Sequence, residues 1–216
     1  PSEKQQSQYV PFERLVELWA ELKILAKFPN KKNYSMSQIQ TYQNFLIISL
    51  YTLLDPERND YIMKVVTDKQ FKMLDKDDIK KQNFLVKSTK GGLKFVINEY
   101  KTSRFYDEKV IVIEGRLKTI INKWLKMNKS KNFLINRSGN PLTANNLTKR
   151  IKYITGKYLG EGKSFGTNMI RHIYTSDKFN KVLKEMEQTS KNMSHSMGVQ
   201  QAIYIKDFET KSDEED

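Results

Sequence analysis

Apolar and polar residues along the first part of the chain recur with the period of a helix. From Pro11 onward apolar side chains fall on one helical face, and this proline suits a first turn. A second helix begins at Ser35, because Gln38 stands three residues later and completes a capping box. It is apolar on most sides near its end, which predicts a central position, and Asp55 with the proline after it ends the helix. Residues 1–9 are polar and are expected to be loose.

The middle of the chain changes to the pattern of strands. A short helix over about 58–66 is expected first. Short β-branched or aromatic runs follow over residues 83–87, 93–98 and 110–113. Gly91-Gly92 separates the first two runs, which is typical of a hairpin. The simplest arrangement is a small three-stranded antiparallel sheet.

After Gly115 the pattern returns to that of helices, which are expected over roughly 116–127, 143–158, 167–179, 181–192 and 198–206. A tail over 207–216 ends in four consecutive acidic residues and is predicted to be disordered. The expected fold is therefore α+β, a mainly helical single domain over 35–206 with a small sheet. An N-terminal segment with a leading helix, over 1–34, precedes this domain.

Composition narrows the class of partner. The formal net charge is +13 in 216 residues, and an excess of this size points to a polyanion, with nucleic acid ahead of an acidic membrane surface. Cysteine is absent, which excludes disulfides and thiolate zinc sites and fits a reducing, intracellular compartment. No signal peptide or membrane span is visible in the sequence. The chain begins at Pro1 rather than Met, so we expect that it has been trimmed.

Three short motifs near the C-terminus are weak when each is taken alone. Asn168 and Arg171 stand three residues apart, so they share a face of a helix, and His172 follows. His195 lies between two serines, and Tyr204 comes nine residues after it. The ordinary interpretations are a solvated arginine, a structural histidine and a core or rim tyrosine.

Taken together, the order and spacing of these residues resemble the C-terminal signature of tyrosine recombinases, the integrase-type enzymes. Family members show a His-x-x-Arg-His helix, a Gly-His-Ser turn and then the nucleophilic tyrosine about nine residues later. The family's first arginine follows a buried helix, which matches Arg58, and its lysine lies in a loop of the small sheet, which matches Lys101. The resemblance spans about residues 35–206 and is specific as an ordered set.

The chain also departs from this family pattern. Asn168 stands where many relatives have histidine, which weakens or alters one proton carrier or phosphate contact. The usual Thr-Gly-x-Arg turn is replaced by Asp55-Pro56-Glu57-Arg58. Only residues 1–34 precede the catalytic region, so the family's N-terminal core-binding domain is expected to have been removed or to be absent. The sequence around Arg58 resembles that of the divergent family members carried by large DNA viruses and their satellites.

The resemblance implies a fold like that of the DNA breaking-rejoining enzymes and a role for each matched residue. Tyr204 would attack a DNA phosphate to form a 3′-phosphotyrosine link, with Arg58 and Arg171 stabilising the charge on the non-bridging oxygens. His195 would donate to the same oxygens or assist with the tyrosine proton. Lys101 would protonate the leaving 5′ oxygen as the general acid. Asn168 is the sixth residue of the catalytic site that the resemblance implies.

The partner implied is double-stranded DNA, bound by a chain that is a monomer when free and a tetramer on paired DNA sites, with no membrane, metal or cofactor. The lysine excess should bind the phosphates of flanking DNA. The residues expected to do so are Lys87, Lys90, Lys149, Arg150 and Lys152.

Two alternatives to recombination stay open. A type IB topoisomerase shares the residue set and the fold, and a DNA-binding module without activity would arise if the residues coincide by chance. Two other motifs are weaker. A phosphate loop ending in Gly162-Lys163-Ser164 lacks the strand that should lead into it. An acidic cluster of Asp75, Asp77 and Asp78 lies in a lysine-rich polar stretch and is typical of a solvated loop.

Overall fold

The structure, a computed structural model, describes residues 2–101, 103 and 108–199. The chain divides into two compact units, Pro1–Tyr174 and Thr175–Asp216. The sheet and most of the helices belong to the first unit. In the second unit, the described part consists of the later turns of one long helix, the turn that follows it and a three-residue helix.

The N-terminal helices begin at side-chain caps. The first helix, α1 (Glu3–Gln8), starts at Ser2, whose hydroxyl and the Gln5 side chain form a reciprocal capping box. The expectation that this stretch is loose is therefore wrong, because the cap satisfies the amide groups at the start of even a short helix. The helix α2 (Phe12–Leu25) follows, and α3 (Met36–Thr52) begins at the predicted box between Ser35 and Gln38.

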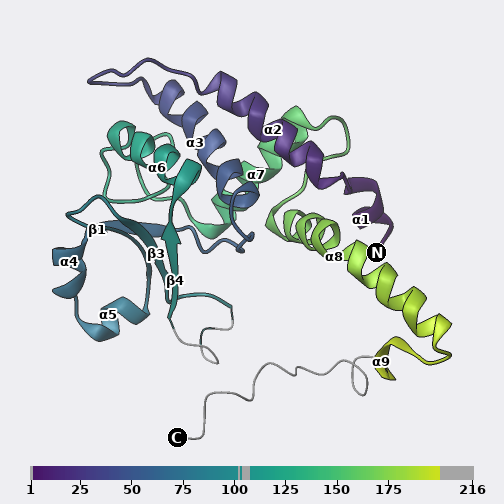
Figure 1. The fold of residues 1–216 in the computed structure, drawn as a ribbon. Coiled ribbons are helices and arrows are strands. Elements are labelled where there is room, and N and C mark those ends of the chain that lie inside the picture. Colours follow the sequence, from purple (N-terminus) through teal and green to yellow (C-terminus); the bar gives the residue numbers. More distant parts are fainter. Residues whose placement is uncertain (1, 102, 104–107, 200–216) are drawn as a thin grey trace, which may run out of the picture. The chain divides into compact units, whose positions relative to one another are not determined.

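The helix α3 lies at the centre of the first unit, as its apolar pattern predicts. It packs against α2, α6 (Gly115–Met127) and α7 (Ala144–Tyr158) (Figure 1). Gln43 is only 1% exposed on this helix, yet its side chain is fully used. Its amide donates to the carbonyl of Ile135 at 2.9 Å and accepts from the amide of Ile135 at 2.8 Å. A buried polar group is thereby paired, which avoids the cost of an unmet hydrogen bond.

The sheet has four strands in the order β1 (Met63–Thr67), β2 (Asn83–Lys87), β3 (Leu93–Ile97) and β4 (Lys109–Ile113). The antiparallel pairing of the last three strands confirms the predicted hairpin and its extension. The strand β1 pairs parallel with β2, so the sheet is mixed, and the prediction of three antiparallel strands is wrong. The protein is nevertheless α+β and mainly helical.

The prediction of a helix over 58–66 is also wrong, because the same strand β1 occupies part of this range. Its second half is β1, a run that ends in β-branched Val65, Val66 and Thr67, which favour a strand. The backbone of β1 bonds to β2 on one side and to residues 131–133 on the other, where Phe133 donates to Met63 at 2.8 Å. Both partners are distant in sequence, so no local period reveals this pairing.

The two faces of the sheet bury separate apolar clusters. One face joins the main core through Leu85, Phe95 and Ile97. The other face forms a smaller cluster with α4 (Asp68–Lys72) and α5 (Lys76–Lys80), made of Phe84, Val86, Val96 and their partners Val66, Phe71, Leu74 and Ile79. The aspartates of the expected loop lie on or next to α5, where Asp75 caps the helix by accepting from the amide of Asp77.

The last long helix, α8 (Thr167–Asn192), begins in the first unit and continues into the second. The two helices predicted over 167–179 and 181–192 are thus one continuous helix, since no proline or glycine interrupts the sequence between them. A three-residue helix, α9 (Met197–Val199), follows. Within the described residues, no helix combines the length and the apolar character needed to cross a bilayer.

Candidate active site

A cavity of about 800 Å³ in the first unit gathers residues that lie far apart in the sequence. Three of the predicted catalytic residues line it, namely Arg58, Lys101 and Asn168. Lys152, one of the predicted DNA-binding residues, lines it as well. Other parts of its wall come from α1, α7 and the first turn of α8. The cavity therefore brings together half of the six predicted catalytic residues.

The charges on the wall of this cavity have one sign. Among the described residues that line it, the charged groups are Lys4, Arg58, Lys101 and Lys152, and none is acidic. None of these four side chains forms an ion pair with a residue that the structure describes. The wall also includes the start of α8, where amide groups lack partners within the helix and carry partial positive charge. This arrangement suits a bound anion.

The backbone of Arg58 is held by two buried tyrosines. Tyr51, near the end of α3, donates a hydrogen bond from its hydroxyl to the carbonyl of Arg58. Its ring packs edge-to-face on the ring of Tyr61, with 5.4 Å between the ring centroids. Burial raises the pKa of Tyr51 well above its ordinary value, so the hydroxyl stays protonated and can donate. Tyr61 in turn donates to the carbonyl of Leu50 at 3.3 Å. The Arg58 loop is thus fixed against the end of α3.

Arg171 does not line the cavity, but it contacts the same loop. Its Nε donates to the carbonyl of Pro56 at 3.2 Å, two residues before Arg58. One turn further along α8, the hydroxyl of Tyr174 donates to the carboxylate of Asp55. The first turns of α8 are therefore bonded to the loop that carries Arg58.

Asn83, which the sequence prediction missed, joins the segments that carry Arg58 and Lys101. Its amide donates to the carbonyls of Asp60 and Glu99, both at 3.0 Å. Its side-chain oxygen accepts from the amides of Asn98 and Glu99, both at 2.8 Å. The residue is 4% exposed, so four backbone groups depend on one buried side chain. The available signal is a polar residue directly before the apolar run of Phe84, Leu85 and Val86.

Replacing Asn83 by Ala is expected to lower the free energy of unfolding by about 2–4 kcal/mol, because buried backbone groups lose their partners. Backbone amides near residues 60 and 98–99 should also exchange with solvent faster. The two effects are measured by urea unfolding and by hydrogen exchange. Asn122→Ala on the exposed face of α6 is the matched control and should change stability by less than about 0.5 kcal/mol. Equal stability of the two variants would contradict the role assigned to Asn83.

Asn168 is exposed in the first turn of α8, which approaches α7 closely. A Cβ atom added at Gly166 would lie 3.1 Å from Cγ2 of Thr148, so a glycine allows this contact. Thr148 also accepts a hydrogen bond from the side chain of Asn59 at 3.0 Å. Residues 59, 148 and 166 all line the cavity, so these contacts form part of its wall.

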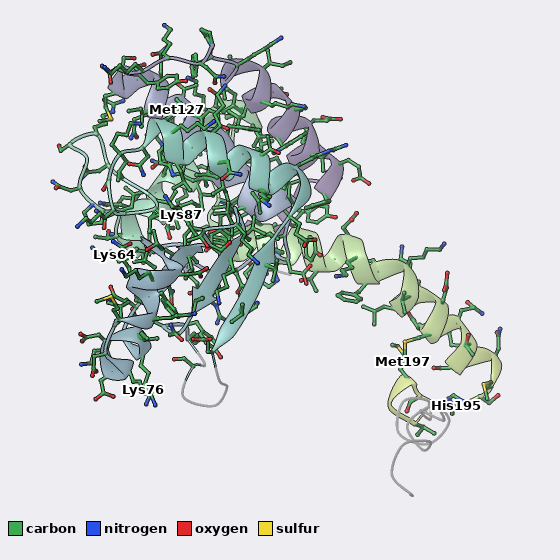
Figure 2. The ribbon with its side chains drawn as sticks, turned by 60° about the vertical axis from the view of Figure 1, so that its left-hand side comes forward. Lys64, Lys76, Lys87, Met127, His195 and Met197 are labelled. Carbon is green, nitrogen blue, oxygen red and sulfur yellow. The ribbon has the colours of Figure 1, made fainter. Side chains whose placement is uncertain are left out.

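In the second unit, His195 lies in the turn beyond the end of α8 (Figure 2). Its backbone amide donates to the carbonyl of Ser190 at 3.0 Å, and its Nδ1 lies 3.2 Å from the carbonyl oxygen of Ser196. Ser194 has a φ of 57°, the only positive φ of a non-glycine residue in the described part. Glycine adopts this left-handed conformation without the steric cost that a serine side chain brings.

Replacing Ser194 by Gly is expected to stabilise this turn by about 0.5–1 kcal/mol, because glycine adopts the left-handed conformation without steric cost. The amide of His195 should then exchange roughly threefold more slowly, which hydrogen exchange measures. Ser196→Gly should act in the opposite direction, since its hydroxyl accepts from the amide of Val199 at 3.3 Å. Faster exchange in Ser194→Gly would show that this backbone conformation is not the one adopted in solution.

Tyr204, the predicted nucleophile, lies outside the described residues, as does most of the helix predicted over 198–206. His195 belongs to the second unit. The predicted set is thus divided. Arg58, Lys101, Asn168 and Arg171 lie in the first unit, and three of these share the cavity.

The predicted DNA-binding residues fall into three groups. Lys152 lines the cavity, whereas Lys149 and Arg150 line a different hollow of about 390 Å³. Arg150 donates to the side chain of Asn44 at 2.6 Å and to the carbonyl of Gln40 at 3.2 Å, and burial lowers its pKa. Its guanidinium therefore stabilises the packing of α7 on α3.

The third group lies on the hairpin of the sheet. Lys87 is the last residue of β2 (Figure 2). Lys90 is exposed in the turn that follows. Neither lines the cavity. Any contact that they make with a polyanion would therefore lie outside this cavity.

Among the described residues, no group of three or more His, Asp or Glu side chains is arranged to hold a metal ion. No family model, no curated protein and no solved structure matches this chain.

Proposed function

We propose that this chain is the catalytic domain of a tyrosine recombinase, which cuts and rejoins double-stranded DNA through a covalent bond to Tyr204. The proposal includes a fold of the DNA breaking-rejoining class. The observation that carries it is the cavity lined by Arg58, Lys101 and Asn168, whose charged residues in the described part are all basic.

The sequence separation of these residues gives the observation its weight. Arg58 follows α3, Lys101 follows β3 and Asn168 lies at the start of α8, so they are separated by dozens of positions. They match the family pattern by their order in the sequence, and Arg58 and Lys101 match it also by the predicted helix and sheet loop beside them. Residues matched by chance would be expected to scatter over the surface, whereas these line one cavity, and Arg171 bonds to the loop of Arg58.

The chemistry of phosphoryl transfer accounts for these residue types. A phosphodiester is an anion, and attack on its phosphorus adds charge to the non-bridging oxygens. Arg58 and Arg171 remain charged and present paired donors to those oxygens. The Tyr204 hydroxyl loses its proton, to His195 or to solvent, as its oxygen bonds to phosphorus. The bond to the 5′ oxygen breaks at the same time, and Lys101 gives that oxygen a proton. The reverse attack by a 5′ hydroxyl rejoins the strand, so no ATP is needed.

DNA outside the cleaved bond would be bound through its phosphates. Lys152 on the cavity wall and Lys149 one turn earlier on α7 are suited to this contact. The logarithm of the affinity should fall with the logarithm of the salt concentration, with a slope of about −0.9 per phosphate contact. In this proposal the chain is a monomer when free and assembles as a tetramer on paired sites.

The test uses a pool of nicked duplexes with randomised sequence around the nick. When the nicked strand is cleaved near the nick, a short fragment diffuses away and the covalent adduct is trapped. We expect a protein–DNA band on a denaturing gel, formed in the presence of EDTA, and sequencing of the trapped DNA should reveal the preferred site. Peptide mapping should find the nucleotide on Tyr204.

A binding assay on the same pool separates the possible failures. Retarded bands without any covalent adduct would reduce the function to DNA binding without catalysis. An adduct that maps to another residue would contradict the assigned nucleophile. Absence of both binding and adduct at low salt would remove DNA as the partner.

A further inference from the structure

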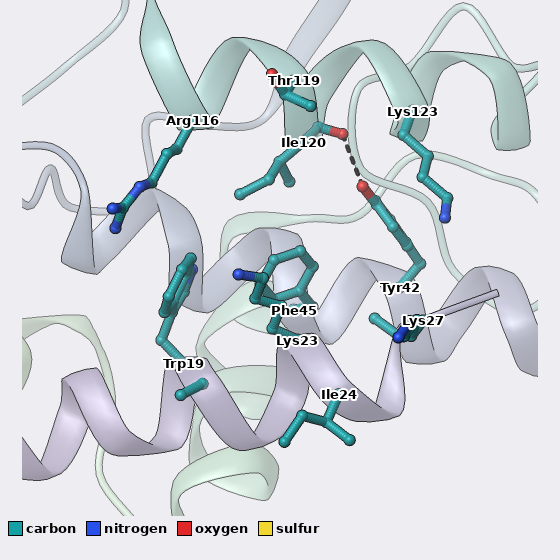
Figure 3. Close-up of a pocket in the computed structure, with 12 residues that line it drawn as sticks. Trp19, Lys23, Ile24, Lys27, Tyr42, Phe45, Arg116, Thr119, Ile120 and Lys123 are labelled. Atoms are coloured by element: carbon teal, nitrogen blue, oxygen red, sulfur yellow. Dashed lines mark hydrogen bonds between the residues drawn. The ribbon is translucent and has the colours of Figure 1, made fainter.

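A second cavity, of about 720 Å³, lies between α2, α3 and α6 of the first unit (Figure 3). It shares no lining residue with the cavity that contains Arg58. Its floor is formed by Trp19, Tyr42, Phe45 and Ile120, and Ile24 stands at its edge. We call this the α2–α6 groove.

The floor of the α2–α6 groove is apolar because its aromatic residues direct their polar atoms into the protein. The indole N–H of Trp19 donates to the hydroxyl of Ser49 at 2.9 Å. The hydroxyl of Tyr42 donates to the carbonyl of Ile120 at 3.0 Å (Figure 3). Ile24 is 73% exposed at the edge of this floor and extends its apolar surface. The groove therefore presents an apolar surface that a partner could cover.

The walls of the α2–α6 groove are basic on both sides. Lys23 lies on α2 and Lys27 lies two residues after its end, while Arg116 and Lys123 come from α6, two turns apart. None of the described residues that line the groove is acidic. Lys27 and Arg116 are exposed and form no ion pair with a described residue, so both can bind an added anion.

The apolar floor and the basic walls together favour one kind of binding partner. Nucleic acid offers phosphates but little aliphatic surface to cover Ile24 and Ile120. A lipid offers aliphatic surface but concentrates its charge in one headgroup, whereas these cations flank the floor on both sides. An amphipathic helix with acidic residues on both flanks of an apolar stripe matches both features. Arg116 and Lys123 are separated by about 10 Å along their helix, which is close to one heptad of such a partner.

We propose that the α2–α6 groove binds an acidic amphipathic helix of a partner protein. The apolar stripe of that helix would cover Ile24 and the aromatic floor, and its carboxylates would pair with Lys27 and Arg116. This inference is independent of the DNA reaction, because it uses none of the residues assigned to that reaction. It predicts a docking surface that stays available while the other cavity is occupied.

The probe is a fluorescein-labelled synthetic helix with leucines at heptad positions a and d and glutamates on both flanks. Its anisotropy is measured against the whole chain and against two groove variants, the double substitution Lys27→Glu with Arg116→Glu, and Ile24→Ser. Each groove variant should bind the peptide about tenfold more weakly or worse. A peptide with glutamine in place of glutamate, and one with the same composition in scrambled order, should bind as weakly.

Matched controls keep total charge and exposed apolar area comparable. The double substitution Lys69→Glu with Lys72→Glu reverses two exposed lysines on α4. Met73→Ser removes an apolar side chain that is 76% exposed. Both controls should bind the peptide within about twofold of the parent chain. Thermal unfolding of every variant checks that the fold is retained.

The remaining outcomes overturn the proposal. It fails if the peptide does not bind, or if binding is the same in the groove variants and the controls. The proposal also fails if the double variant Lys27→Glu with Arg116→Glu loses binding to phosphatidylserine vesicles or to a single-stranded oligonucleotide but binds the peptide as tightly as the parent chain does. In either of those last cases the groove belongs to a membrane or to nucleic acid.

Discussion

The Tyr204→Phe variant is expected to bind DNA as tightly as the parent chain and to form no covalent adduct. Phenylalanine has the same ring but no oxygen that can attack phosphorus, so the rate should fall by roughly 10⁴-fold or more. A free phenol has a pKa near 10, and ionising it at pH 7 costs about 4 kcal/mol, which the basic groups of the site should reduce. The measurement is the initial rate of adduct formation on a selected nicked duplex.

The control for this prediction is another tyrosine. Tyr9 is 42% exposed at the end of α1 and does not line the cavity, so Tyr9→Phe should form the adduct at the parental rate. An adduct that persists in Tyr204→Phe would exclude this residue as the nucleophile. Loss of the adduct in both variants would point to a general effect of tyrosine replacement.

Replacing Arg58 by Ala is expected to slow adduct formation by about 10²–10³-fold, because a donor to the charged oxygens is lost. Stability should change little. The Arg58 side chain makes no hydrogen bond to a described residue, and the Tyr51 hydroxyl bonds to its backbone carbonyl, which Ala retains. Arg58→Lys should recover only part of the rate, since an ammonium group lacks the paired planar donors. Single-turnover rates and urea unfolding measure the two effects.

Arg171→Ala provides a contrast within the same pair of arginines. The rate should fall to a similar degree, but stability should also fall, because Nε of Arg171 bonds to the carbonyl of Pro56. Arg116→Ala, on the wall of the α2–α6 groove, should leave the rate unchanged. A parental rate in Arg58→Ala would remove this residue from the site even if the cavity does bind DNA.

Local sequence signals predicted the elements whose stabilising contacts are close in sequence. The capping box at Ser35 and the hairpin around Gly91-Gly92 are both confirmed, because each depends on residues only a few positions apart. The strand β1 was mistaken for a helix, since its partners are β2 and residues 131–133. Distant pairing of this kind leaves no period in the sequence.

The same distinction applies to the candidate site. The order of Arg58, Lys101, Asn168 and Arg171 could be matched to a family pattern, so these residues could be selected from the sequence. The structure adds a physical link between the loops of Arg58 and Lys101, which is the side-chain amide of Asn83 bonded to both. A buried asparagine is common in proteins, and nothing in the sequence around Asn83 indicates which backbone groups it satisfies.

The small apolar cluster beneath α4 and α5 has a consequence for local unfolding. Its side chains, among them Phe84, Val86 and Val96, are shielded from solvent by two five-residue helices. The opposite face of the sheet is secured by the larger core through Leu85 and Phe95. Release of residues 68–82 would therefore expose one side of the strands and leave the other side packed. This segment is where a protease should first gain access to the sheet, while the helical core remains intact.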